Sequence, residues 1–341
     1  MQTDLSPSVA SGDVPSAEPV RVLYIAGIGR SGSTLLCRAL GSVEGFVATG
    51  ELMRIVDRGV GKGDLCSCGT PVRECRIWAA VWQRLTRVTP AFDFPKLEHT
   101  RHRVTESAEF LRYFVLDPPA DLARDLDEYR RFLSALYRAV RDVTGARVVV
   151  DASKNLMFAR LLTETPGLDV SVLHLVRDSR GVANSLAKRQ PRPGTNGRHE
   201  HFRQFGPVLG SILWNTAQIT TERIQARASG WTRLRYEDFV ADPEPVLLEA
   251  LQALYPAYAP RQLAHVERRA LRLGEDLADD RGLRPEGVGA QRGERRRSHN
   301  KPACNQDDTA GGRCHREQAV AEIGARGDVA REKARAEHEA P

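Results

Sequence analysis

No apolar stretch in this sequence approaches the length of a membrane span, and its first residues carry neither a basic start nor an apolar run. The sequence therefore predicts neither a membrane span nor a secretory signal. We expect residues 1–20 to form a disordered leader and the protein to be cytoplasmic. Across the whole chain, 41% of the residues are hydrophobic and 28% are charged, which suffices for one domain with a large core.

A strong excess of charge is also missing. The formal net charge is +6, and part of that excess comes from Arg292 and residues 295–297 near the C-terminus. No basic stretch interleaved with aromatic residues accompanies this cluster, although that pattern is typical of nucleic-acid surfaces. The composition therefore argues against a nucleic-acid partner.

Cysteines are few, and those in LCSCGTPVRECRIW, residues 65–78, do not have a standard zinc spacing. Cys66, Cys68 and Cys75 offer only three thiolates, whereas a closed metal site has four ligands. His99 could complete such a site, but nothing in the spacing demands it. Reduced cysteines in a compact loop are favoured over a metal site or a disulfide, and no metal is predicted.

Aromatic residues are absent from residues 271–341, which also hold few Leu, Ile or Val side chains among many charged ones. Such a segment buries too little apolar surface to offset the entropy lost on ordering. We expect a disordered or atypical C-terminal tail there. A single domain is then expected over residues 21–270.

The most informative segment that is present is RVLYIAGIGRSGSTLL, residues 21–36. An apolar run over residues 22–25 is followed by three glycines and a helix-like segment, the pattern of strand, phosphate loop and helix. Gly27 and Gly32 fit the Walker frame, but Ser33 stands where an ATP-binding loop has Lys. Arg30 must then supply the positive charge, which argues against an ordinary NTPase.

A second strand-turn-helix pattern lies in VSVLHLVRDSRGVANSLAKR, residues 170–189. Arg177 stands at the carboxyl end of the strand, and Ser185 follows on the helix. The planar donor fork of Arg suits a terminal phosphate that carries nearly two charges. In the simpler alternatives, Arg177 caps a helix or pairs with Asp178, and Ser185 faces solvent.

In combination, the two motifs resemble the sulfotransferases that use 3′-phosphoadenosine 5′-phosphosulfate (PAPS), and the cysteine segment is similar to one in a bacterial branch of that family. The resemblance extends to tyrosylprotein- and carbohydrate-type members. It implies that GRSGST, residues 29–34, grips the 5′-phosphosulfate, that Arg177, Ser185 and Arg189 hold the 3′-phosphate, and that the Tyr of YEDF lies against the nucleotide. It also implies that no metal is required. The donor-binding residues so implied are Arg30, Ser31, Gly32, Ser33, Thr34, Arg177, Ser185, Arg189 and Tyr236.

Sulfuryl transfer needs in-line positioning, stabilisation of charge on the leaving oxygen, and a base. Glu51 in ATGELMRI resembles the general base of some family members, and a Glu with an ordinary pKa of about 4.3 is a carboxylate at neutral pH. Lys154 in DASKN resembles a lysine that offsets the developing charge, and Arg54 is an acceptor-binding candidate. Alternatively, Glu51 caps a helix that begins near Leu52, and Lys154 is a surface residue beside Asp151.

Strands and helices alternate along the chain, which is typical of a parallel sheet with its ligands at the carboxyl ends of the strands. The predicted fold class is α/β, a P-loop-type doubly wound parallel sheet with a helical insertion over the site. Besides the first strand, strands are expected over 147–150, 170–176 and 231–236, and helices over 51–58, 76–87, 103–115, 121–143, 156–162 and 207–228.

The acceptor is left open, since a small molecule, a carbohydrate or a peptide with a hydroxyl or amine would each fit. A P-loop kinase or NTPase remains an alternative. So does a catalytically impaired nucleotide-binding homologue, because residues 271–341 lack a convincing counterpart of the glycine-containing loop that family members return to the nucleotide.

Overall fold

The structure of the protein, a computed structural model, describes residues 18–88, 92–106 and 118–256. All of these residues belong to one compact unit. The expected tail over residues 271–341, and all but the last three residues of the expected leader, lie outside the described part. Among the described helices, none combines the length and the hydropathy that crossing a bilayer would need.

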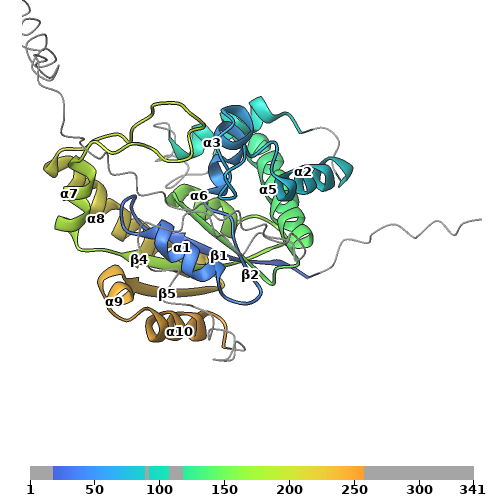
Figure 1. The fold of residues 1–341 in the computed structure, drawn as a ribbon. Helices are drawn as coiled ribbons and strands as arrows, with labels where there is room; N and C mark the ends of the chain where they lie inside the picture. Colours follow the sequence, from blue (N-terminus) through green and yellow to red (C-terminus); the bar gives the residue numbers. More distant parts are fainter. Residues whose placement is uncertain (1–17, 89–91, 107–117, 257–341) are drawn as a thin grey trace, which may run out of the picture. The chain divides into compact units, whose positions relative to one another are not determined.

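The centre of this unit is a parallel five-stranded sheet (Figure 1). Its strand order is β2-β3-β1-β4-β5, so that β1 lies in the middle, with β3 and β2 on one side and β4 and β5 on the other. The predicted α/β class with a parallel sheet is confirmed. The strands are β1 (Val20–Ala26), β2 (Phe46–Ala48), β3 (Val148–Lys154), β4 (Leu168–Val176) and β5 (Gly230–Arg235).

Both faces of the central strand are buried, which explains its continuous apolar run. Leu23 and Ile25 belong to the core cluster on one face, and Val22 and Tyr24 belong to the cluster on the other. Successive side chains of a strand point to opposite faces, so helices must cover both sides of the sheet.

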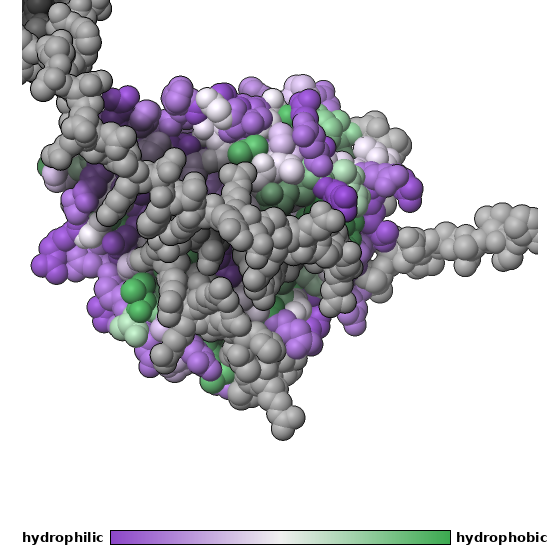
Figure 2. All heavy atoms as spheres, in the orientation of Figure 1, coloured by the Kyte–Doolittle hydropathy of each residue, from purple (hydrophilic) through white to green (hydrophobic). Residues whose placement is uncertain are grey.

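One face is covered by α1 (Ser33–Gly41), α9 (Tyr236–Ala241) and α10 (Pro243–Leu254). The other is covered mainly by α5 (Ala120–Thr144) and α6 (Leu156–Thr163), with α2 (Arg76–Val88) and α3 (Phe94–Thr105) beyond them (Figure 1). Where described residues are visible in Figure 2, hydrophilic side chains predominate and hydrophobic ones form small patches.

The helical insertion lies between β2 and β3 and consists, in the described residues, mainly of α2, α3 and α5. The helices expected over 76–87 and 121–143 are therefore confirmed. Of the helix expected over 103–115, the structure describes only the start, which forms the end of α3 (Phe94–Thr105), and residues 107–115 lie outside the described part. Asp93 explains the earlier start, since its side chain accepts a hydrogen bond from the Lys96 backbone N–H at 3.0 Å and a proline follows in the first turn.

The helix expected over 51–58 forms, but not as an α-helix. A 3-10 turn spans Leu52–Arg54, and a π-helical segment spans Ile55–Gly61. The π-helical segment ends where the Lys62 N–H bonds the carbonyl of Asp57 at 2.9 Å. Such single π turns are often found at functional sites.

Two further helices, α7 (Ser179–Ala187) and α8 (Pro207–Ile224), lie between β4 and β5 in the chain. Side-chain caps fix where the helices after β3 and β4 begin. Asn155 accepts from the Phe158 N–H at the start of α6, and Asp178 accepts from the Arg180 N–H at the start of α7. Because β3, β1 and β4 are neighbouring parallel strands, the loops that follow them lie at the same edge of the sheet.

Candidate active site

The loop between β1 and α1, residues 27–32, requires glycine at two positions, and we call it the glycine loop. Gly27 has a φ of +143°, and a Cβ there would lie 2.6 Å from the carbonyl oxygen of Leu175 on β4. Gly32 has a φ of +94° and is the N-cap of α1. The loop is closed by the Ser31 hydroxyl, which donates to the Ile28 carbonyl at 2.7 Å.

The start of α1 supplies backbone donors at this loop. The first N–H groups of an α-helix have no intrahelical partner, and here they belong to Ser33 and Thr34. Ser31 and Ser33 are both buried, and their expected contacts with the donor stay predictions. The arrangement is suited to an anion, as the sequence predicts.

Arg30 is held in an unusual backbone conformation within this loop. Its φ of +72° lies in the left-handed region, which costs a non-glycine residue about 1–3 kcal/mol. Its Nε donates to the Ser185 hydroxyl at 3.1 Å, and its guanidinium lies 4.9 Å from the centre of the Phe202 ring. Burial and the nearby charge of Arg177 lower the pKa of Arg30.

Arg177 projects from the end of β4 toward the same loop. Its Nη1 donates to the Arg30 carbonyl at 3.0 Å, and its guanidinium stacks 4.4 Å above the Tyr236 ring. The alternative pairing with Asp178 is wrong, because Asp178 forms its ion pair with Arg180 at 2.9 Å. Ser185 meets Arg30 rather than facing solvent alone.

Tyr236, the first residue of α9, packs directly on the glycine loop. A Cβ added at Gly32 would lie 2.2 Å from the Tyr236 ring, so the ring is layered between Gly32 and Arg177. Tyr236 begins a helix, as one sequence interpretation expects, and its expected contact with the nucleotide stays a prediction. The structure thus brings Arg30, Arg177, Ser185 and Tyr236 together.

Arg189 does not join this group. It lies beyond the end of α7, is exposed, and makes no ion pair with any residue in the described part of the chain. Its expected contact with the 3′-phosphate stays a prediction.

Glu51 and Lys154 meet at the neighbouring strand ends. Lys154 Nζ donates to Glu51 Oε1 at 2.7 Å and to the Ala152 carbonyl at 2.7 Å. Glu51 occupies the N-cap position of the 3-10 turn, but its side chain accepts no capping hydrogen bond. Only 15% of the Lys154 side chain is exposed, so neither simpler alternative describes these residues.

The charge of this pair is set by its surroundings. Burial acts to raise the pKa of Glu51, but Lys154, with smaller contributions from Arg192 and Arg54, outweighs it and lowers the pKa below its ordinary value. Although 41% of the Glu51 side chain is accessible, it lies in a concave region with protein around it. Glu51 is therefore a carboxylate at neutral pH, with Lys154 as its cationic partner.

Asp151 lies near the Glu51–Lys154 pair and supports the backbone there through hydrogen bonds. It is fully buried and accepts hydrogen bonds from the Tyr137 hydroxyl and from the backbone N–H of Ser153 at 2.7 Å. The Ser153 hydroxyl also donates to Asp151 at 2.5 Å and accepts from the Met53 N–H at 3.1 Å. Burial raises the pKa of Asp151 to about 6, against the opposing effect of these hydrogen bonds.

Arg54 forms its ion pairs with carboxylates other than that of Glu51. Its guanidinium forms ion pairs with Asp57 at 3.3 Å and with Glu106 at 2.5 Å. It still lines the cavity beside Glu51, so its expected role at the acceptor stays a prediction.

A cavity of about 360 Å³ lies beside the start of α1. Thr34 lines it from the first turn of α1, Glu51 and Lys154 line it from the strand ends, and Trp78 of α2 lines it from the helical insertion. Arg38 also faces it from α1. A ligand held at the glycine loop would therefore border the space that Glu51 and Lys154 reach.

Sequence reasoning missed two residues of this cavity, Arg192 and Phe202. Both lie near an isolated bridge between Pro191 and His201, where the chain folds back on itself. Arg192 lies 5.4 Å from the Phe202 ring centre, on which Arg30 also stacks. The Pro- and Gly-rich composition around them signals only a loop, so no periodic pattern could have found them.

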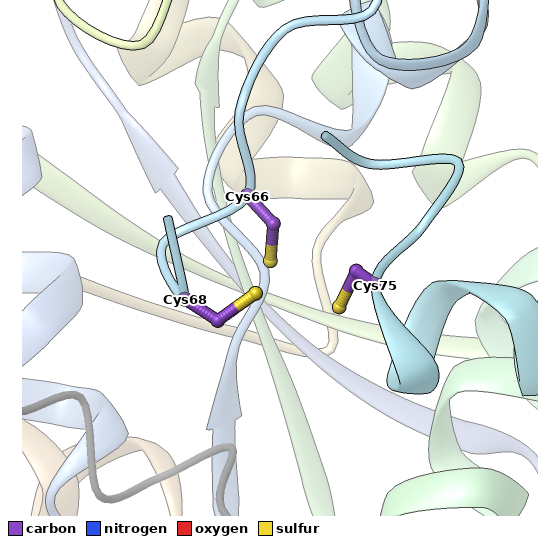
Figure 3. A group of neighbouring side chains, drawn as sticks. All are labelled: Cys66, Cys68 and Cys75. Atoms are coloured by element: carbon purple, nitrogen blue, oxygen red, sulfur yellow. The ribbon is translucent and has the colours of Figure 1, made fainter. Parts of the chain in front are cut away.

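The three thiols of Cys66, Cys68 and Cys75 gather beside this cavity, with all their sulfur atoms within 4.8 Å of one another (Figure 3). His99 is exposed on α3 and is not among these converging ligand atoms.

Comparisons with known proteins bear on the whole domain. Among curated proteins, no sequence matches the chain closely enough to count as a relative. Three solved structures are similar to it: the sulfotransferase domain from the Synechococcus PCC 7002 olefin synthase, the sulfotransferase domain from the curacin biosynthetic pathway, and the sulfotransferase STF9 from Mycobacterium avium. Their identities to this chain are 17%, 16% and 12%, and their TM-scores are 0.38, 0.43 and 0.43. The alignments cover 77%, 77% and 76% of this chain and 80%, 83% and 70% of those chains.

A family model described as the sulfotransferase family matches residues 23–255, which is well over half of the chain and includes the glycine loop, Glu51, Lys154, Arg177 and Tyr236. The chain therefore belongs to the sulfotransferase family.

Proposed function

We propose that this sulfotransferase takes its sulfuryl group from PAPS and transfers it to a hydroxyl or amine acceptor. The observation that carries the proposal is the positive charge at the glycine loop. Arg30 and Arg177 converge there, yet neither forms an ion pair with a carboxylate among the described residues. A nucleotide with a 5′-phosphosulfate and a 3′-phosphate would supply the missing negative charge.

Two parts of the donor would be held by two parts of this cluster. The 5′-phosphosulfate would lie against Arg30 and the backbone N–H groups at the start of α1, where the helix dipole favours an anion. The 3′-phosphate would lie against Arg177 and Ser185. The Arg30–Ser185 hydrogen bond supports one continuous binding surface for both groups.

Chemistry would take place where the cavity meets the Glu51–Lys154 pair. Glu51 would accept the proton of the acceptor hydroxyl or amine as its oxygen or nitrogen forms a bond to sulfur. The bond between sulfur and the bridging phosphate oxygen would break, with its electron pair remaining on that oxygen. Lys154 would offset the negative charge that develops there.

The acceptor would occupy the cavity of about 360 Å³. Its wall mixes apolar side chains, such as Val72 and Trp78, with the cations Arg54 and Arg192. Like Arg30, Arg192 forms no ion pair with a carboxylate in the described part of the chain. The proposed acceptor is a small molecule, a carbohydrate or a peptide with a hydroxyl or amine, and the proposed transfer needs no metal.

Incubation of the purified protein with PAPS labelled in its sulfuryl group tests this proposal. The acceptor panel should contain phenols, sugars, amines and tyrosine peptides, and each reaction should be repeated with the Glu51→Gln variant. We expect label to move to at least one acceptor class with the wild type only. A protein that binds the nucleotide but transfers no label to any class would instead be the catalytically impaired homologue.

A further inference from the structure

The cluster of three thiols takes no part in the proposed transfer and has no assigned role. The Sγ atoms of Cys66, Cys68 and Cys75 all lie within 4.8 Å of one another, and Figure 3 shows the three sulfurs directed toward a common space. We propose that Cys66, Cys68 and Cys75 bind one Zn²⁺ ion, which fixes a wall of the acceptor cavity.

Two local turns bring the ligands together. Cys66 and Cys68 lie on a tight turn in which the Cys66 N–H bonds the Thr70 carbonyl at 2.8 Å and the Gly69 N–H bonds the Cys66 carbonyl at 2.9 Å. In the next turn, the Cys75 N–H bonds the Pro71 carbonyl at 3.0 Å. The nonstandard spacing in the sequence is thus compensated by the folding of the chain.

The distances suit a metal with thiolate ligands. Two thiolates bound tetrahedrally to Zn²⁺, each at about 2.3 Å, lie about 3.8 Å apart. Sulfur atoms within 4.8 Å can reach that separation through small side-chain rotations. Cys68 is exposed, so solvent reaches the cluster and a water molecule can supply the fourth ligand.

Three thiolates held this close together would repel one another, and a bound divalent cation would remove that repulsion.

Cys75 directly precedes α2, and the Ala79 N–H bonds its carbonyl at 2.8 Å, which fixes the third ligand at the N-terminus of a 13-residue helix.

The same cluster forms part of the cavity wall. Cys66 and Ser67 line the cavity, and Trp78, one turn into α2 from Cys75, lines it too. The Leu65 N–H bonds the Gly194 carbonyl at 2.8 Å, which connects the cysteine turn to the segment that carries Arg192. A metal that joins Cys66 to Cys75 would therefore fix the position of the cysteine turn relative to α2. Its role would be structural, since both of these elements line the cavity.

The test uses the full chain, purified with reductant and without oxygen, then stripped with a chelator and titrated with Zn²⁺. We expect about one equivalent to bind. Cys66→Ser, Cys68→Ser and Cys75→Ser should each weaken the affinity by about a hundredfold or more. Cys37→Ala, which alters a cysteine of α1 outside the cluster, should bind zinc like the wild type.

Two further readouts do not depend on enzymatic activity. Co²⁺ added in place of Zn²⁺ should give thiolate-to-cobalt charge-transfer absorption in the wild type and lose it in Cys68→Ser, whose exposed site minimises effects on folding. Trypsin should cleave after the exposed Arg73 several-fold more slowly when Zn²⁺ is present.

Three results would overturn the proposal. The first is zinc binding below one half equivalent by the reduced wild-type protein. The second is an affinity that the cysteine substitutions leave unchanged. The third is a disulfide between two of these cysteines, seen by mass spectrometry, that persists in protein purified with reductant, because those sulfurs could not then be ligands. None of these results depends on whether the protein transfers sulfate.

Discussion

Lys154 Nζ lies 2.7 Å from Glu51 Oε1, so that a single ion pair joins the end of β3 to the turn that follows β2. Lys154 has a φ of +63°, a left-handed conformation that costs a non-glycine residue about 1–3 kcal/mol. The Asp151–Ser153 network next to it holds the backbone in this shape. Strain of this kind is often concentrated at functional sites.

Glu51→Gln should keep donor affinity and lower kcat by about 10²- to 10⁴-fold, because the amide keeps the shape of the side chain but cannot accept a proton. Single-turnover kinetics and calorimetric titration with 3′-phosphoadenosine 5′-phosphate measure the two effects separately. A variant that keeps most of its kcat would mean that another residue is the base.

The ion pair also predicts the pH dependence of the reaction. Because the pKa of Glu51 is lowered, the base stays ionised as pH falls, and wild-type kcat should fall only below the ordinary Glu value of about 4.3. Lys154→Met removes the main cause of the lowered pKa while burial still raises it. The acid limb of its kcat profile should therefore shift to higher pH, in addition to any loss in rate. Superimposable profiles would contradict this coupling.

Arg177→Ala and Ser185→Ala should each weaken donor binding about ten- to a hundredfold, since a hydrogen bond to a charged group contributes about 1.5–3 kcal/mol. Arg180→Ala is the matched control, because Arg180 lies three residues after Arg177, is 91% exposed and pairs only with Asp178 among the described residues. Equal donor affinities in all three variants would remove the assignment of the 3′-phosphate to Arg177 and Ser185.

Gly32→Ala should damage the glycine loop, because the new Cβ would lie 2.2 Å from the Tyr236 ring and the φ of +94° strains any other residue. We expect at least a tenfold loss of donor affinity, together with a lower midpoint of thermal unfolding. Gly29→Ala is the control for stability, since nothing lies within 4 Å of a Cβ there. Equal unfolding midpoints for the two variants would argue against this packing of Tyr236.

Asp151→Asn should change how stability depends on pH. Burial raises the pKa of Asp151 to about 6, so the folded protein binds this proton more tightly than the unfolded chain does. The bound proton adds about 3 kcal/mol to the free energy of unfolding. This contribution is fully present below about pH 4 and is lost as pH rises through about 6. Urea unfolding at pH 4.5 and 7.5 should show this loss in the wild type relative to the variant. A constant difference between the two proteins would exclude it.

The features that the sequence predicted well are local or periodic. The glycine loop follows from glycines at positions that need positive φ, and β1 and β4 follow from buried apolar runs. The strand expected over residues 147–150 ends later than the apolar run indicates, because β3 continues to Lys154. The family relationship predicted from the two motifs is confirmed, whereas the roles of the individual site residues stay predictions.

The features that the sequence could not predict depend on distant partners. The strand β2 has only three residues, too few for a periodic signal. Arg54 turns to Glu106, a residue far along the chain, and Arg192 reaches the cavity only because its segment folds back through an isolated bridge. The convergence of Cys75 with Cys66 likewise depends on the turn at Pro71 rather than on spacing.

The central claim, that the glycine loop and Arg177 form a PAPS site, is tested most directly by calorimetric titration of the full chain with nucleotides. The titrations compare 3′-phosphoadenosine 5′-phosphate in the presence of a metal chelator with ATP in the presence of Mg²⁺. We predict that the bisphosphate binds without metal and at least about tenfold more tightly than ATP with Mg²⁺, because its 3′-phosphate binds to Arg177 and Ser185. Tighter binding of ATP with Mg²⁺, or no binding of the bisphosphate, would contradict the account.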